Sequence, residues 1–107
     1  MLIKVEYLKN SQVVVHAKGK LDIYTTNDYL DEVKKNIKYA QELILDFSQI
    51  SYIASIGLRA ILELNKAMQD KNANMIIKNV CNDVLNIFKI TGFDDFLNIE
   101  NDTDDEN

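Results

Sequence analysis

The chain has 107 residues, of which 47% are hydrophobic, and a formal net charge of -5 at pH 7. This length suits one compact domain with a single core and leaves no room for a second domain within these residues. Five of the 17 acidic residues lie in the segment 100–107, which leaves 12 acidic and 12 basic residues before it. A near-neutral domain lacks the basic stripe of a nucleic-acid-binding protein, so we expect no nucleic-acid partner.

The composition also predicts the domain limits and the compartment. Residues 1–99 are expected to form the domain, and residues 100–107 an acidic, disordered tail, because the tail has no apolar side chains to bury. The start MLIKVEYLKNSQ lacks the apolar run of a signal peptide, and no stretch approaches the ~20 apolar residues that cross a bilayer. We therefore expect a cytoplasmic protein without a membrane partner. The single cysteine, Cys81, is expected to be a buried thiol.

The first part of the chain predicts a hairpin followed by a helix. Residues 2–8 alternate loosely between apolar and charged side chains, as a half-buried strand does, and the turn KNSQ leads into the valine-rich run VVVHAKG. Thr25 or Thr26 is then expected to cap a helix. Its apolar side chains Leu30, Val33 and Ile37 fall on one face.

The remainder of the chain alternates between strands and helices. The strands are expected at residues 42–47, 74–80 and 96–99. A helix from Ser55 is expected to bury Leu58, Ile61 and Leu62, and a shorter third helix ends in a left-handed cap at Gly92. The order β-β-α-β-α-β-α-β predicts a single-domain α/β fold with a mostly parallel central sheet, because strands joined by helices pair in parallel through right-handed crossovers.

Ser55 is expected at a rim of this sheet. The segments that follow the carboxyl ends of parallel strands share one rim, here residues 19–26, 48–55 and 79–82. Two compatible roles for the serine remain open. Its hydroxyl can cap the following helix by accepting from a backbone amide. It can also be a phosphorylation site, because a helix N-terminus tolerates a dianion.

Residues for catalysis or cofactor binding do not come together in the sequence. A glycine-rich phosphate loop is missing, and His16 and Cys81 stand alone, so we expect no cofactor and no metal site. Ser55 is not bracketed by glycines, and His16 lies inside a strand, where a structural role is expected. Asp46 lacks the acidic pair of a receiver domain. We therefore expect a protein that is not an enzyme.

Three segments in register resemble the STAS domains of anti-sigma-factor antagonists. The run DFSQISYIASIGL is similar to the family signature, in which D-L/F-S and a short apolar stretch precede D-S-S/T-G-L and a helix. GKLDIYTT is similar to the segment G-x-L-D-x-x-T. IIKNVCNDVLNIFKITGF is similar to the ending L-x-N-V…V-x-x-x-F-x-x-T-G-F/L. The resemblance covers nearly the whole chain up to Ile99.

The resemblance implies a partner switch. In that family, a serine at the position of Ser55 is phosphorylated by an anti-sigma factor that is also a kinase, and a phosphatase reverses the modification. The unphosphorylated form binds the kinase and frees a sigma factor. We expect Tyr24 and Ile56 to add apolar area to the rim, and Ile53 to belong to the core. The expected partner-binding residues are Asp22, Tyr24, Thr25, Ala54, Ile56, Gly57 and Arg59.

The chain departs from the family pattern beside the serine. Ala54 replaces the signature aspartate, and Ile56 replaces the second Ser/Thr. An alternative therefore stays open, in which the protein is a non-phosphorylated STAS subunit of a larger signalling or lipid-transport assembly. Arg59, one helical turn after Ser55, is either a solvated charge that meets an acidic partner or a cation that folds back onto the phosphoserine.

Overall fold

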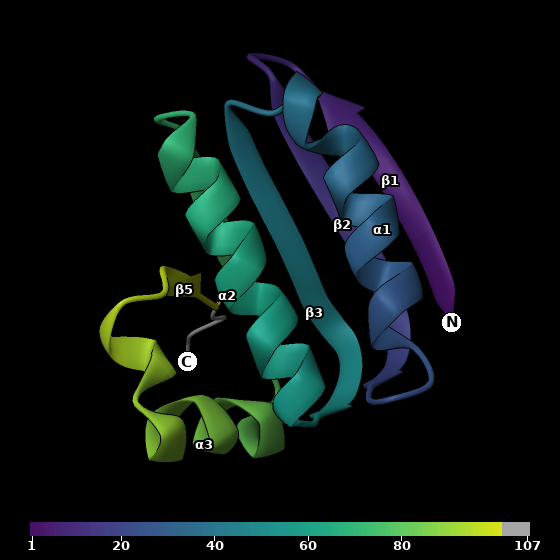
Figure 1. Ribbon diagram of the computed structural model, residues 1–107, viewed down its shortest axis with the longest axis vertical. Helices are drawn as coiled ribbons and strands as arrows, with labels where there is room; N and C mark the ends of the chain where they lie inside the picture. The colour runs from purple at the N-terminus through teal and green to yellow at the C-terminus, as the bar shows by residue number, and fades with distance from the viewer. Residues whose placement is uncertain (102–107) are drawn as a thin grey trace, which may run out of the picture.

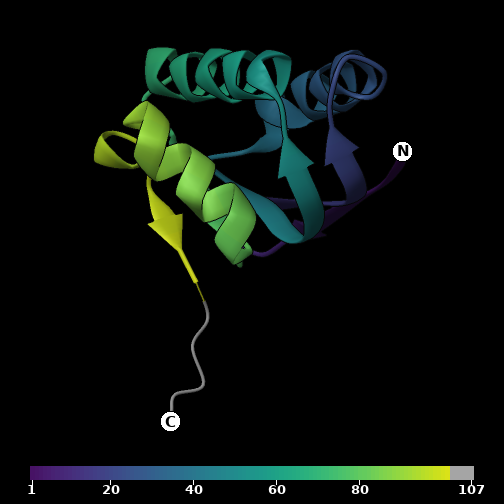
Figure 2. The same ribbon diagram turned by 90° about the horizontal axis from the view of Figure 1, so that it is seen from below.

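Five strands form one sheet in the order β1-β2-β3-β4-β5, and the two long helices, α1 and α2, cover a single face of it (Figures 1 and 2). The structure is a computed structural model that describes residues 1–101. The elements are β1 (Leu2–Leu8), β2 (Gln12–Leu21), α1 (Thr26–Asn36), η1 (Ile37–Tyr39), β3 (Glu42–Ile53), α2 (Ser55–Asp70), β4 (Asn74–Lys78), α3 (Asn82–Thr91), η2 (Phe93–Asp95) and β5 (Ile99–Glu100). The predicted order and the predicted α/β class are confirmed.

The ends of β2 and β3 extend beyond the rest of the sheet. β1 pairs with β2 in the antiparallel sense, and the other three pairings are parallel. β4 reaches only as far as Asp46 of β3, whereas β2 stays paired with β3 up to Leu21 and Ile53. Figure 2 shows this two-stranded extension rising toward the helices. It carries the segment before α1 and the segment before α2 to the same place.

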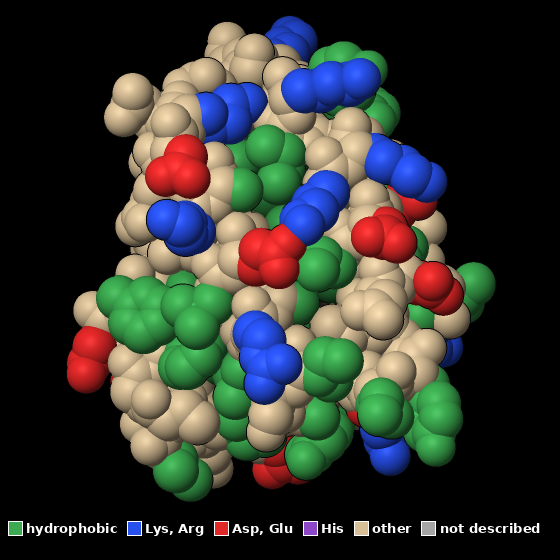
Figure 3. Space-filling view, viewed as in Figure 1, with side chains coloured by type: hydrophobic (Ala, Val, Ile, Leu, Met, Phe, Trp, Pro, Cys, Tyr) green, Lys and Arg blue, Asp and Glu red, His purple; other side chains and the backbone are tan. Residues whose placement is uncertain are grey.

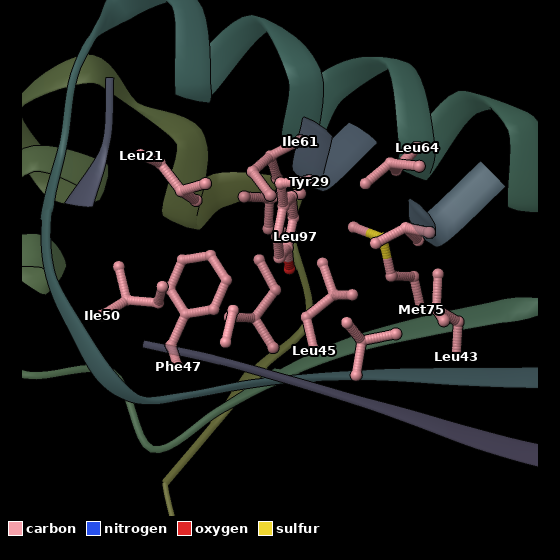
Figure 4. Packing of buried hydrophobic residues seen from close by; sticks show 14 of the residues in the cluster. Leu21, Tyr29, Leu43, Leu45, Phe47, Ile50, Ile61, Leu64, Met75 and Leu97 are labelled. Atoms are coloured by element: carbon pink, nitrogen blue, oxygen red, sulfur yellow. The ribbon is translucent and has the colours of Figure 1, made fainter. Parts of the chain in front are cut away.

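The core lies between the sheet and the helices. Strand alternation points Leu45 and Phe47 of β3 toward the helices, where they meet Tyr29 of α1 and Ile61 and Leu64 of α2 (Figure 4). All five side chains are fully buried. Each large apolar side chain buried in this way contributes about 1.5–3 kcal/mol relative to exposure. Within residues 1–101, no helix combines the length and the apolar character needed to cross a membrane.

The buried face of α2 differs from the prediction at one position. Leu58 and Ile61 are buried as expected, but Leu62 is 40% exposed, so its predicted burial is wrong. Each residue turns an α-helix by about 100°, so the buried stripe continues from Ile61 to Leu64 and Met68, and Leu62 falls outside it. Ile53 is buried, as expected.

Helix α1 is anchored by a residue that the periodicity did not single out. Tyr29 is fully buried, and its hydroxyl has no hydrogen-bond partner among the described residues. Burial raises the pKa of this phenol, which therefore stays neutral. Val33 is also fully buried, whereas Leu30 and Ile37 are half-buried at the margin of the core.

The third helix ends where predicted, but the last strand begins three residues later than predicted. Gly92 ends α3 in the left-handed region with φ 79°, which confirms the predicted cap. The turn η2 then delays the last strand to Ile99–Glu100, whereas residues 96–99 were predicted. Asn101 follows and accepts a hydrogen bond from the Val80 amide through Oδ1 at 2.9 Å. Residues 102–107 of the predicted tail lie outside the described residues.

The neighbours Ile61 and Leu62 provide a matched test of the α2 assignment. Ile61→Ala is expected to lower the free energy of unfolding by about 2–5 kcal/mol, because it leaves a cavity in the core. Leu62→Ala is expected to cost less than about 1 kcal/mol, because that side chain is partly solvated. Chemical denaturation of both variants measures the two values. Similar losses in the two variants would mean that α2 is rotated about its axis.

Candidate functional site

One backbone hydrogen bond holds the site together. The Ala54 amide donates to the Leu21 carbonyl at 2.8 Å, directly after the last paired residues of β2 and β3. The turn before α1 and the first turn of α2 are therefore neighbours, as predicted from the shared rim. The third predicted segment reaches this rim through Cys81, whose Sγ lies 3.5 Å from the Ile50 carbonyl oxygen. Cys81 is half-buried, not fully buried as expected.

Asp22 and Thr25 shape the turn before α1. The Asp22 carboxylate accepts from the Tyr24 amide at 2.9 Å, and the Asp22 carbonyl accepts from the amides of Thr25 and Thr26. The Thr25 hydroxyl donates to the Lys20 carbonyl and accepts from the Asp22 amide at 3.1 Å. The turn projects the neighbouring side chains outward, so that Tyr24 is 87% exposed.

Neither threonine caps α1 with its side chain. Thr25 occupies the N-cap position, but its hydroxyl is used within the turn, and Thr26 Oγ1 is buried without a partner among the described residues. Thr25 therefore occupies the predicted cap position, but neither hydroxyl makes the expected capping hydrogen bond. The turn that follows β2 uses the Thr25 hydroxyl, which is therefore not available to accept from an amide at the start of α1.

Ser55 is the first residue of α2, and Ala54 holds the N-cap position. The hydrogen bond from Ala54 to Leu21 keeps Ala54 extended, with φ -92° and ψ 175°, so the helix begins at Ser55, one residue earlier than a serine cap requires. The predicted capping role of Ser55 is therefore wrong. Its side chain is exposed, and its hydroxyl makes no hydrogen bond to any described residue. The site thus presents a free hydroxyl next to the unpaired amides of a helix N-terminus.

Gly57 allows α2 to approach the end of β2. A Cβ at this position would lie 2.7 Å from Ile53 Cγ1 and 3.0 Å from both Cβ and the carbonyl oxygen of Leu21. These neighbours are two buried side chains and a backbone atom, which have little room to move. Only glycine fits here without displacing the start of α2, and therefore Ser55.

Exposed apolar side chains lie on the segments that adjoin the serine. Figure 3, in the orientation of Figure 1, shows hydrophobic side chains concentrated in its lower half, where α2 begins, below a region rich in charged side chains. Ile23 is 70% exposed beside Tyr24, and Ile56 is half-buried. Arg59 is exposed and forms no ion pair with the described residues; with Leu62 it lines a shallow groove along α2. This arrangement suits contact with another protein better than the binding of a small molecule.

His16 has a structural role away from this rim. It lies between Glu6 and Asp46, with Nε2 2.8 Å from the Glu6 carboxylate and Nδ1 2.7 Å from the Asp46 carboxylate. These two hydrogen bonds raise the pKa of His16, Glu6 first and Asp46 second. Burial acts to raise the pKa of Asp46, but hydrogen bonds from Ser48 and His16 outweigh it and lower that pKa. Among residues 1–101, no group of side chains has the arrangement of a metal site.

Comparisons with known proteins agree on one family. The sequence model of the STAS domain matches residues 4–106. An anti-sigma-B factor antagonist of Listeria monocytogenes is 21% identical over 92% of this chain and 88% of its own length, and one of Staphylococcus aureus is 27% identical over 82% of each. The fold matches unphosphorylated SpoIIAA, an anti-sigma factor antagonist, with a TM-score of 0.81, 18% identity, and coverage of 96% of this chain and 90% of SpoIIAA. It matches the phosphorylated form of Bacillus SpoIIAA with a TM-score of 0.75, 17% identity, and coverage of 96% and 93%.

The close contact at Gly57 can be tested by adding one methyl group. Gly57→Ala is expected to lower the free energy of unfolding by about 1–3 kcal/mol, because the methyl group overpacks the contact with Leu21 and Ile53. Helix propensity alone favours alanine by about 1 kcal/mol, so the two effects have opposite signs. Urea denaturation measures the net change. A more stable variant would contradict the close approach of α2 to β2.

The His16 contacts predict a pH dependence of stability. Because the pKa of His16 is raised above 6.5 in the folded state, its stabilising effect is complete below pH 6.5 and disappears as the pH rises through the raised value. Asp46, with its lowered pKa, stays ionised in this range. The difference in unfolding free energy between the wild type and His16→Gln should therefore be larger at about pH 5.5 than at about pH 8.5. This difference in unfolding free energy should stay below about 1 kcal/mol, because His16 is partly exposed. A difference that grows with pH would contradict this assignment.

Proposed function

Because the chain belongs to the STAS domain family, we propose that it is an anti-sigma-factor antagonist that binds a serine-kinase anti-sigma factor and is switched by phosphorylation of Ser55. One observation carries this proposal: Ser55 offers an exposed, unbonded hydroxyl in the middle of an apolar rim. The protein acts as the kinase's substrate and partner and catalyses no reaction of its own. A phosphatase restores the binding form, and the whole cycle belongs in the cytoplasm.

The position of Ser55 lets the fold accept a phosphate. The hydroxyl makes no hydrogen bond to residues 1–101 that modification would break. The amides of the first turn of α2 have no partners within the helix, and the positive end of the helix dipole favours a negative group. The phosphorylated and unphosphorylated proteins are therefore expected to share one fold. The switch acts on the partner, not on the fold of this chain.

The residues around Ser55 divide into supporting and contacting groups. Asp22 and Thr25 hold the turn, and Ala54 and Gly57 fix the start of α2 against β2. Tyr24 and Ile56 supply apolar area, and Arg59 supplies a positive charge that no described residue pairs with. A partner that covers this surface would enclose the Ser55 hydroxyl at its centre. A dianion there lacks a counter-charge unless Arg59 or the partner provides one.

A second candidate function rests on the residues beside the serine. Ala54 and Ile56 replace the acidic and hydroxyl residues of the family signature. The contact that fixes residue 54 is made by its backbone amide, which donates to the Leu21 carbonyl. The side chain of Ala54 makes no capping hydrogen bond, so an alanine is sufficient for the fold at this position. A STAS subunit of a larger signalling or lipid-transport assembly would use the same rim without modification of Ser55.

Incubation with a serine-kinase anti-sigma factor and ATP distinguishes the two candidates. The intact mass is expected to rise by one phosphate in the wild type and in the control variant Ser51→Ala, and to stay unchanged in Ser55→Ala. Ser51 is a suitable control because it is an exposed serine of β3 near the same rim. A protein that binds the kinase but takes up no phosphate would support the subunit role. Phosphate uptake by Ser55→Ala would exclude Ser55 as the site.

Binding measurements with the same kinase test the switch itself. Phosphorylation adds about -1.5 to -2 charges, and burying them against an apolar partner is expected to weaken binding by about 10³-fold. Ser55→Asp should weaken binding less, because it adds one charge, and Ser55→Ala should bind like the wild type. Isothermal titration calorimetry gives the affinities of the wild type, the phosphorylated protein and the two variants. Equal affinities for Ser55→Asp and Ser55→Ala would contradict the mechanism.

A further inference from the structure

The outer edge of β1 has no partner strand among the described residues. β1 pairs only with Gln12–Lys18 of β2, and Figure 1 shows it at the margin of the sheet, outside α1. The free edge is seven residues long, whereas the strand at the opposite end of the sheet, β5, has two. A free strand edge presents a row of unpaired amides and carbonyls, which another strand can complete.

Side chains on β1 leave apolar area uncovered at both of its ends. Ile3 and Val5 pack against the core, so the alternation of the strand places Leu2, Lys4, Glu6 and Leu8 on the face of the sheet away from the helices. On that face, Leu2 is 72% exposed and Leu8 is 44% exposed. The two leucines flank a central lysine and a central glutamate.

This pattern is complementary to itself. When two copies of β1 pair in the antiparallel sense around a two-fold axis perpendicular to the sheet, residues on the same face stand opposite each other. With the axis at Val5, Lys4 faces the partner's Glu6, and Leu2 faces the partner's Leu8. Both charged pairs and both apolar pairs are then attractive cross-strand neighbours.

The neighbouring registers are unfavourable. An axis at Lys4 would place Lys4 opposite its own copy, and an axis at Glu6 would oppose two glutamates. Like charges directly opposite each other destabilise a strand pair. The order of Lys4, Val5 and Glu6 therefore selects one register, in which no like charges face each other across β1.

The charged groups are available for this pairing. Lys4 is exposed and forms no ion pair or hydrogen bond with the described residues. Glu6 holds His16 through Oε1, which leaves Oε2 for a second contact. We propose that two copies of this chain associate edge to edge through β1, in the register centred on Val5, and so form one continuous sheet.

This association is independent of the proposed switch. The rim that contains Ser55 lies at the ends of β2 and β3, whereas the contact uses the outer edge of β1. Both copies therefore keep the Ser55 surface free. Loss of the dimer would leave the phosphorylation of Ser55 unaffected, so the two proposals can fail separately.

Variants with exchanged charges test the proposal by analytical ultracentrifugation. At protein concentrations up to about 1 mM, a dimer with a Kd of about 1 mM or lower is clearly detected. The wild type and the double variant K4E/E6K are expected to dimerise. The single variants Lys4→Glu and Glu6→Lys should each dimerise at least about tenfold more weakly, because both cross-strand ion pairs become like-charge pairs. The control Lys66→Glu lies on the exposed side of α2, away from the edge of β1, and should behave like the wild type.

Mixing the two single variants gives the decisive measurement. One copy then carries glutamates at positions 4 and 6 of β1, and the other carries lysines there. Both cross-strand pairs are therefore attractive, and a mixed dimer should form. This result does not depend on either variant dimerising alone, and thermal melts confirm that both are folded. A wild type that stays monomeric up to about 1 mM would overturn the proposal. So would single variants that dimerise like the wild type, or a mixture that remains monomeric.

Discussion

The hydrogen bond from the Ala54 amide to the Leu21 carbonyl, 2.8 Å long, is the constraint on which the proposed site depends. It joins the end of β2 to the residue before α2, after the two strands have extended beyond the rest of the sheet. It also brings α2 so close to β2 that Gly57 has no room for a side chain. The rim is therefore a rigid junction of two loops.

This junction would let Ser55 be modified, as proposed, without refolding of the chain. The bond to Leu21 keeps Ala54 extended and leaves Ser55 as the first helical residue, exposed and with no hydrogen bond from its hydroxyl to the part of the chain that the structure describes. The neighbouring turn is fixed by the contacts of Asp22 and Thr25, so Tyr24 remains outside whether or not Ser55 is modified. Under the proposed switch, the change in charge acts on the partner that covers the rim.

The order of elements and the shared rim follow from the sequence, because alternating strands and helices permit few arrangements. The structural role of His16 and the left-handed cap at Gly92 were also predictable from local patterns. The start of α2 was not, since a serine before an apolar helix is an ordinary cap and only the tertiary contact of Ala54 moves the boundary. The exposure of Leu62 depends in the same way on how α2 is rotated against the sheet.

Hydrogen exchange at the Ala54 amide tests the rigid junction most directly. If the bond to Leu21 holds the rim together, this amide exchanges only through global unfolding, and its opening free energy equals that of the slowest amides of β3. The Tyr24 amide, which bonds to the exposed turn, serves as an internal reference for local opening. An Ala54 amide that exchanges as fast as that of Tyr24 would contradict the account, because the two loops would then open independently of the fold.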